Sequence, residues 1–156
     1  MQNSNQVPDA IFVFGLSVDQ QAAREFAINL FDWSRNNPGR GLRINLNSGG
    51  GNIQNAMFLY ESFGQLRSFG HHLTIAVSGR AASCAAWLVQ AADLRIIGSV
   101  SEFLIHEVSS AVDGSLSDIR RELERCTQLQ NKTFDLLCSR SNLTHEQIHT
   151  RVDGGI

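Results

Sequence analysis

The first residue with the potential for covalent chemistry is a serine at the start of a predicted helix. Ser83 follows Gly79-Arg80-Ala81-Ala82, and the apolar run 73–77 (LTIAV) precedes this turn. A helix N-terminus offers unpaired N–H groups and the positive end of a dipole, and both stabilise negative charge that develops nearby. The turn lacks the G-x-S-x-G pattern of an α/β-hydrolase elbow. From the local pattern alone, Ser83 fits a nucleophile and a simple helix N-cap equally well.

A histidine at the end of an apolar run could supply a general base. His106 follows Phe103-Leu104-Ile105, and functional groups collect at strand ends in open α/β sheets. Imidazole can take a proton from a serine hydroxyl because it titrates close to neutral pH. Glu107 is a poor orienter for His106, since adjacent strand residues point to opposite faces. On spacing alone, a structural histidine is the stronger alternative.

A glycine-rich stretch, 47–51 (NSGGG), joins a predicted strand to a predicted helix. Three glycines expose backbone N–H groups and permit positive φ angles, so this loop could hold a phosphate or an oxyanion. Neither G-x-x-x-x-G-K-[ST] nor G-x-G-x-x-G is present, so nucleotide binding lacks its confirming motif. A tight connection without any ligand is the alternative.

Other histidines and cysteines give weaker indications. His71 and His72 precede a predicted strand, and a solvated loop is their expected environment. His145 and His149 match H-E-x-x-H by letter, but a third metal ligand would have to come from elsewhere. We therefore predict no metal site and no cofactor. Cys84 is expected to pack as a small buried residue rather than to act as a nucleophile.

The elements that must position these residues follow from the apolar periodicity. Strand-like runs alternate with helical i, i+3, i+4 patterns, which predicts an α/β fold of right-handed β-α-β units. Ser115 with Asp118 and Thr144 with Gln147 form capping-box patterns at two helix starts. The predicted strands are 10–18, 42–46, 73–77, 94–97 and 102–105, and the predicted helices are 20–34, 53–69, 84–92, 115–139 and a short helix opened by Thr144.

Length and composition limit the classes of function. The chain has 156 residues, 42% of them hydrophobic, and a net charge of −2. This composition is typical of one globular domain and gives no general attraction to nucleic acid or to anionic membranes. No apolar run approaches the ~20 residues that span a bilayer, and the three cysteines form no C-x-x-C pair. We predict a cytoplasmic protein with a single domain over 1–156, a flexible N-terminus at 1–9 and a truncated C-terminus.

Four segments, in order, resemble the proteolytic subunit of the Clp protease family. The stretch 44–51 (INLNSGGG) is similar to its I-N-S-P-G-G loop, with Gly49 in place of the proline. The stretch 79–83 (GRAAS) resembles its G-x-A-A-S nucleophile motif, and 104–107 (LIHE) resembles its M-I-H-Q or M-I-H-E motif. The stretch 115–148 resembles its long handle helix and the T-x-E-x-I turn that follows. The Ile-His-Glu form is most similar to phage and prophage members.

The resemblance implies a ClpP-like and crotonase-like β-α-β spiral with a long handle helix, and a Ser-His-Asp triad. Ser83 would attack the peptide carbonyl, and His106 would act first as general base and then as general acid. The N–H groups of Gly51 and Cys84 would form the oxyanion hole. A strand after the glycine-rich loop would bind the substrate in extended form.

The third member of the triad is where the sequence departs from the family. The family's aspartate would fall at Gly155 or Ile156, and Asp153 is the nearest acid. Either Asp153 substitutes for it, or the aspartate lies beyond Ile156, which is our preferred expectation. Loss of the triad acid alone can cost ~10⁴ in turnover, so a chain without it would be impaired.

The function that the resemblance implies is that of an ATP-dependent serine endopeptidase subunit. It would assemble into homo-oligomeric rings, act on peptide or protein substrates, and work with an AAA+ ATPase or in phage head maturation. A non-catalytic ring subunit and a crotonase-fold acyl-CoA enzyme are the alternatives. A reactive-serine probe separates the first hypothesis from the other two, and coenzyme A binding identifies the acyl-CoA enzyme.

Overall fold

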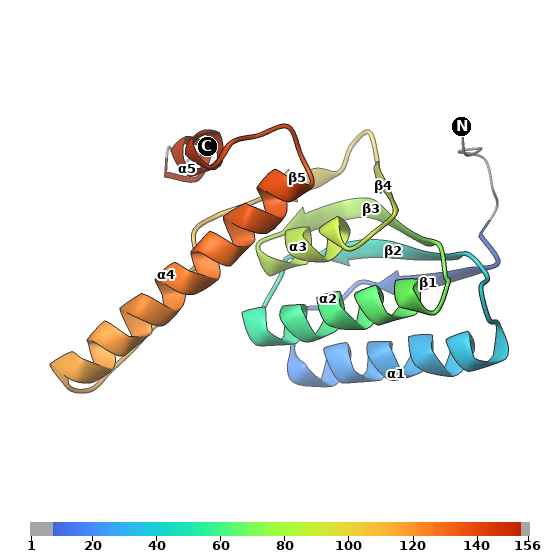
Figure 1. Ribbon diagram of the computed structural model, residues 1–156, viewed down its shortest axis with the longest axis horizontal. Helices are drawn as coiled ribbons and strands as arrows, with labels where there is room; N and C mark the ends of the chain where they lie inside the picture. Colours follow the sequence, from blue (N-terminus) through green and yellow to red (C-terminus); the bar gives the residue numbers. More distant parts are fainter. Residues whose placement is uncertain (1–7, 154–156) are drawn as a thin grey trace. The chain divides into compact units, whose positions relative to one another are not determined.

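A computed structural model describes residues 8–153, with the side chain of the last residue left out. The chain forms two compact units that divide between Leu104 and Ile105. The positions of the two units relative to each other are not determined, so each unit is described by itself (Figure 1).

The first unit contains a sheet in which every strand pair is parallel. Its order is β1-β2-β3-β4, and β5 pairs with the far end of β3. The central strand β3 is long enough to pair with β4 at Thr74 to Val77 and with β5 at Arg80 to Ala82. The strands are β1 (Ala10–Phe14), β2 (Leu42–Ser48), β3 (Leu73–Ala82), β4 (Leu94–Ile97) and β5 (Glu102–Leu104).

Helices α1 (Gln20–Asn36) and α2 (Ile53–Ser68) lie side by side against one face of this sheet (Figure 1). Alternate residues of β1 point toward them, as strand geometry requires. Phe12 and Phe14 both pack edge-on against Phe26 of α1, and Phe26 packs in the same way against Phe63 of α2. These aromatic contacts join the sheet and both helices into one core.

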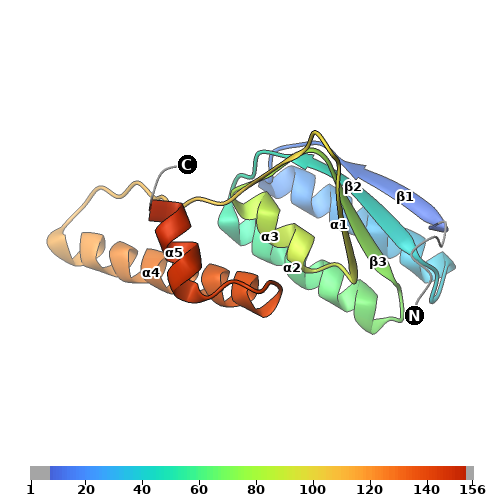
Figure 2. The same ribbon diagram turned by 90° about the horizontal axis from the view of Figure 1, so that it is seen from above.

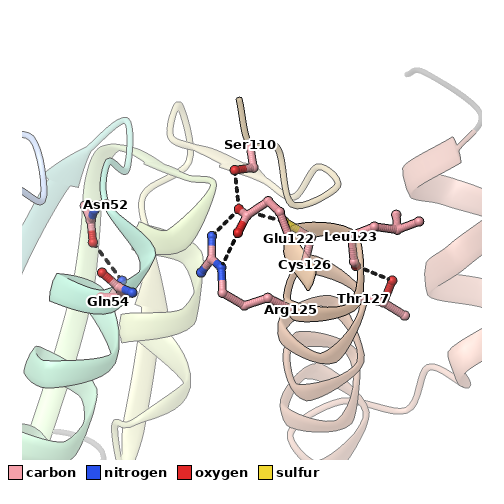
Figure 3. Close-up of polar contacts among 8 residues, drawn as sticks. All are labelled: Asn52, Gln54, Ser110, Glu122, Leu123, Arg125, Cys126 and Thr127. Carbon is pink, nitrogen blue, oxygen red and sulfur yellow. Dashed lines mark hydrogen bonds and ion pairs between the residues drawn. The ribbon is translucent and has the colours of Figure 1, made fainter. Parts of the chain in front are cut away.

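Side-chain caps fix where these two helices begin. The carboxylate of Asp19 accepts the N–H of Ala22 at 2.8 Å. The side chain of Asn52 accepts the N–H of Gln54 at 2.9 Å (Figure 3). Such caps satisfy donors that have no partner inside the helix. Because Asn52 directly follows the glycine-rich loop, its cap also fixes the exit of that loop.

The second unit consists of an irregular segment followed by α4 (Leu116–Ser139) and α5 (His145–Asp153). The short helix α5 packs across α4 (Figure 2), where Phe134, Leu137 and Ile148 form a small buried core. Both predicted capping boxes are present. Ser115 and Asp118 exchange hydrogen bonds at the start of α4, and Thr144 and Gln147 do so at the start of α5.

A carboxylate on α4 holds the irregular segment. Glu122 accepts hydrogen bonds from the guanidinium of Arg125 at 2.8 Å and from the hydroxyl of Ser110, with the thiol of Cys126 at 3.6 Å (Figure 3). The Arg125 side chain is the main reason that the pKa of Glu122 falls to about 2, and Ser110 adds to the effect. Gln130 accepts the N–H of Val108 at 3.0 Å further along the same helix.

The predicted α/β class and the long helix are confirmed, and every predicted element exists, most of them with shifted ends. The first strand ends earlier than predicted, at Phe14, and β3 continues beyond Val77 to Ala82. The solvated environment predicted for His71 is wrong, since this side chain is 3% exposed, whereas His72 is exposed. None of the helices within residues 8–153 combines the length and the apolar character needed to cross a membrane.

Candidate active site

Ser83 lies between β3 and α3 (Cys84–Gln90). Its backbone has a conformation that residues other than glycine rarely adopt. Its φ is 56° and its ψ is −132°. Among residues 8–153 it is the one non-glycine residue with a positive φ. Such a conformation costs roughly 1–3 kcal/mol and persists only where the surrounding structure enforces it. Strained residues of this kind cluster at functional sites.

The hydroxyl of Ser83 does not cap α3, although the residue occupies the N-cap position. The simple N-cap interpretation of Ser83 is therefore wrong. The backbone N–H of Ser83 donates to the carbonyl of Leu104 at 3.0 Å. This bond continues the pairing of β3 with β5, in which Ala82 is the register partner of Leu104. The bond to Leu104 thus fixes the backbone of Ser83, whose side chain is half-buried. The hydroxyl takes no part in capping the helix.

The glycine-rich loop packs directly against the Ser83 turn. A Cβ added to Gly50 would lie 2.7 Å from both the carbonyl oxygen of Ala82 and the Cβ of Ser83. It would also lie 3.3 Å from the backbone nitrogen of Cys84. Gly50 has a φ of 94°, so glycine is required both for its conformation and for this close approach. Sequence analysis missed this role, although the run of three glycines was its signal.

The N–H of Gly51 faces the side chain of Cys84. Burial raises the pKa of the Cys84 thiol, and the Gly51 N–H works in the opposite direction by donating a hydrogen bond to the sulfur. Because the raised pKa favours the neutral thiol, Cys84 is a poor nucleophile. The predicted burial of Cys84 is confirmed, since it is 4% exposed. Ser83, Gly51 and Cys84 therefore lie together at one place in the first unit.

A short segment after β1 holds the loop in place. Val18 bridges Gly51 in parallel fashion. The N–H of Val18 donates to the carbonyl of Gly50, and the N–H of Asn52 donates to the carbonyl of Val18, both at 2.9 Å. The element directly after the loop is α2, which begins at Ile53, so a substrate-binding strand immediately after the loop is not present.

His106 and Asp153 belong to the second unit. His106 follows Leu104 and Ile105, is exposed, and has its Nδ1 2.5 Å from the carbonyl oxygen of Glu107. A carbonyl only accepts, so Nδ1 carries the proton and Nε2 is left as the basic nitrogen. Asp153 is the last residue of α5, and its side chain lies outside the described side chains. Gly155 and Ile156 lie outside the described residues.

The H-E-x-x-H letters belong to α5. Nε2 of His145 contacts the carboxylate of Asp135 at 2.9 Å, and the ring of Phe134 packs against both His145 and His149. Within the described part of the chain, no three His, Cys, Asp or Glu side chains are grouped so that they could hold a metal ion. These histidines are thus engaged in packing α5 onto α4.

Comparison with known proteins agrees with this arrangement. The Clp protease family matches residues 4–155. The chain is 28% identical over 142 residues to the ATP-dependent Clp protease proteolytic subunit 3 of Streptomyces avermitilis. It is 29% identical over 142 residues to the ATP-dependent Clp protease proteolytic subunit 1 of Streptomyces coelicolor. Each match covers 90% of this chain but 63% of the relative's length. The chain, with its strained serine beside a glycine loop on a parallel sheet, belongs to the Clp protease family.

Proposed function

We propose that this chain is a subunit of an ATP-dependent Clp-type serine endopeptidase, with Ser83 as nucleophile and His106 as general base. The observation that carries the proposal is the positive φ of Ser83, in a turn against which Gly50 packs with no room for a Cβ. A helix start that needed only a cap would place the serine in extended conformation with its hydroxyl bonded to the first turn. Ser83 has neither property.

The proposed reaction proceeds through an acyl-enzyme. The Ser83 oxygen forms a bond to the peptide carbonyl carbon as Nε2 of His106 takes the hydroxyl proton. The tetrahedral intermediate collapses when the carbon–nitrogen bond breaks and His106 gives the proton to the leaving amine. Water, deprotonated by His106, then attacks the ester carbonyl. The bond between this carbon and the Ser83 oxygen breaks, His106 returns the proton to that oxygen, and the second peptide leaves as a carboxylic acid.

The oxyanion would be held by the N–H groups of Gly51 and Cys84. Gly51 directly follows Gly50, which packs against the Ser83 turn and the backbone nitrogen of Cys84. A backbone N–H at this position is a favourable donor to a developing oxyanion. One such donor is worth roughly 10²–10³ in rate.

The position of the triad acid is where this chain departs from the family pattern. Within this sequence we propose Asp153 for this role, because it is the nearest acidic residue to the family position. An acid at this place would hold His106 in the tautomer that leaves Nε2 basic. The departure from the family pattern at this position favours a non-catalytic ring subunit as the second candidate. Family membership weighs against the acyl-CoA alternative.

The assembly and location follow the family and remain part of the proposal. We propose homo-oligomeric rings, peptide or protein substrates, an AAA+ ATPase partner, and one peptidase domain that comprises both units. A phage or prophage origin, with a role in head maturation, belongs to the same proposal. The three cysteines are unpaired, which suits a reducing compartment such as the cytoplasm.

Labelling with a fluorophosphonate probe tests the proposal. We expect the wild-type chain to label, and Ser83→Ala to abolish labelling. We expect His106→Ala to slow it by at least about 10³-fold and Asp153→Asn by about 10⁴-fold. Labelling that survives Ser83→Ala would contradict the assignment of the nucleophile. Normal labelling of Asp153→Asn would show that another group is the acid. A folded wild-type chain that does not label would favour the non-catalytic subunit.

A further inference from the structure

Ser48, the last residue of β2, is buried beneath the glycine loop and is 3% exposed. Its hydroxyl donates to the carbonyl of Leu16 at 2.7 Å and accepts the N–H of Gly50 at 3.2 Å. A serine hydroxyl has one proton to donate, so the bond to Leu16 uses it and leaves the oxygen free to accept. The side chain thereby ties the glycine loop to Leu16, which lies 32 positions before Ser48 in the sequence.

The other polar groups of the loop are also engaged in holding it. The carbonyl of Gly50 accepts the N–H of Val18, and the N–H of Asn52 donates to the carbonyl of Val18. Both peptide groups that flank Gly51 are therefore fixed. The Gly50 carbonyl points to Val18, so the Gly51 N–H, on the opposite side of the same trans peptide, points away from Val18.

We propose that Ser48 is a positioning residue for the oxyanion hole. Its hydroxyl oxygen accepts the N–H of Gly50 and so fixes the peptide group that precedes Gly50. This sets the backbone at Gly50, from which the next N–H, that of Gly51, points to the place beside Ser83 where the oxyanion forms. This inference rests on the proposed peptidase function. Donors fixed before the reaction stabilise the oxyanion because they need no reorganisation when charge develops. Without the Ser48 hydroxyl, the backbone at Gly50 is less ordered, and part of the free energy of oxyanion binding is lost in ordering the Gly51 N–H.

The kinetic consequence is a loss in kcat rather than in KM. The oxyanion exists in the transition state and not in the bound substrate. A misdirected donor therefore weakens the binding of the transition state and leaves the binding of the substrate unchanged. With a small peptide ester as substrate, we expect Ser48→Ala to lower kcat about 10-fold to 100-fold with KM nearly unchanged. Ser48→Thr restores a hydroxyl, and we expect it to recover most of the lost kcat.

Ser62 offers a matched control. It is also 3% exposed, and its hydroxyl donates to the carbonyl of Phe58 within α2, away from the loop. Ser62→Ala removes the same atom from an equally buried site, so we expect kcat and KM close to those of the wild type. A general loss of stability would instead affect both variants alike.

Amide hydrogen exchange gives a second result that does not depend on activity. We expect faster exchange at Gly50 and Gly51 in Ser48→Ala and no change there in Ser62→Ala. If Ser48→Ala does not fold, Ser48→Cys serves as the test variant. Cysteine keeps the approximate shape of the serine side chain but forms only weak hydrogen bonds. Wild-type kcat in folded Ser48→Ala or Ser48→Cys, or unchanged exchange at Gly50 in that variant, would overturn the positioning role. An inactive wild-type chain would refute the proposed function, while the exchange result would still decide the role of Ser48 in the loop.

Discussion

The backbone N–H of Ser83 donates to the carbonyl of Leu104 at 3.0 Å, so the last strand of the first unit holds the turn that carries the serine. This bond follows directly on the parallel pairing of Ala82 with Leu104. His106 comes after Leu104 and Ile105 in the chain. In the sequence, the proposed nucleophile thus follows the last residue of β3, and the proposed base lies two residues after the last residue of β5.

The strain at Ser83 predicts unequal effects of two substitutions on stability. Glycine adopts a positive φ without a steric penalty, whereas alanine keeps the penalty that serine has. We expect Ser83→Gly to be more stable than Ser83→Ala by about 1 kcal/mol, although both lack the nucleophile. Urea unfolding followed by circular dichroism measures the difference. Equal stability of the two variants would mean that the turn at Ser83 is not strained in solution.

The contact between Gly50 and the Ser83 turn predicts that a single methyl group disrupts the site. In Gly50→Ala the new Cβ lies 2.7 Å from the carbonyl oxygen of Ala82 and from the Cβ of Ser83. The alanine must also adopt the φ of 94° that glycine has here. We expect about 2 kcal/mol or more of destabilisation and at least about a 10-fold loss of fluorophosphonate labelling. Labelling at the wild-type rate would contradict the packing of the glycine loop against the nucleophile.

Gly64→Ala provides the control for that substitution. Gly64 is exposed in α2, and an added Cβ would have no atom within 4 Å. Alanine is the better helix former by roughly 0.5–1 kcal/mol. We therefore expect Gly64→Ala to stabilise the chain and to leave labelling unchanged, which separates the effect of the site from that of any glycine replacement.

Local signals predicted the elements well because their physical causes are local. The capping box at Ser115 and Asp118 and the apolar periodicity of α1 are readable within one or two helical turns. The positive φ of Ser83 was not predictable, because it depends on Leu104 and Gly50 from distant parts of the chain. The hydrogen bond from Ser48 to Leu16 was not predictable for the same reason, since Leu16 lies on a segment distant in the sequence.

The burial of His71 is another case in which a distant partner decides. Its Nδ1 is 2.8 Å from the carbonyl oxygen of Arg40, and its Nε2 is 2.7 Å from the hydroxyl of Ser34. Because the carbonyl only accepts, Nδ1 donates to Arg40 and Nε2 accepts from Ser34 in the neutral ring. The ring also packs against Trp33, with a centroid distance of 5.4 Å. A loop composition that favours exposure could not reveal these contacts.

This environment predicts unequal effects of replacing two adjacent histidines. His71→Ala leaves a cavity and two buried polar groups without their partner, and we expect a loss of about 2–4 kcal/mol. His72→Ala removes an exposed side chain whose nitrogen lies 3.8 Å from the carboxylate of Asp93, and we expect less than about 1 kcal/mol. Thermal unfolding measures both. Similar losses for the two variants would contradict the burial of His71.

The carboxylate of Glu122 predicts how the second unit responds to acid. Arg125 first, and then the Ser110 hydroxyl, lower its folded-state pKa from 4.5 to about 2. As pH falls, the unfolded chain therefore binds this proton before the folded chain does. The contribution of Glu122 to stability is present above pH 4.5 and is lost progressively as the pH falls from 4.5 to 2.

Glu122→Gln removes that pH dependence, because the amide does not titrate. We expect the urea midpoint of the wild type to fall between pH 4.5 and pH 2 by more than that of Glu122→Gln. Glu124→Gln makes the same change of charge on an exposed residue of α4, and we expect it to follow the wild type. If Glu122→Gln and Glu124→Gln show the same acid response, the carboxylate does not hold Ser110 and the irregular segment in solution. If only Glu122→Gln loses the response, the contact between α4 and Ser110 in the irregular segment before it is a feature of the folded protein.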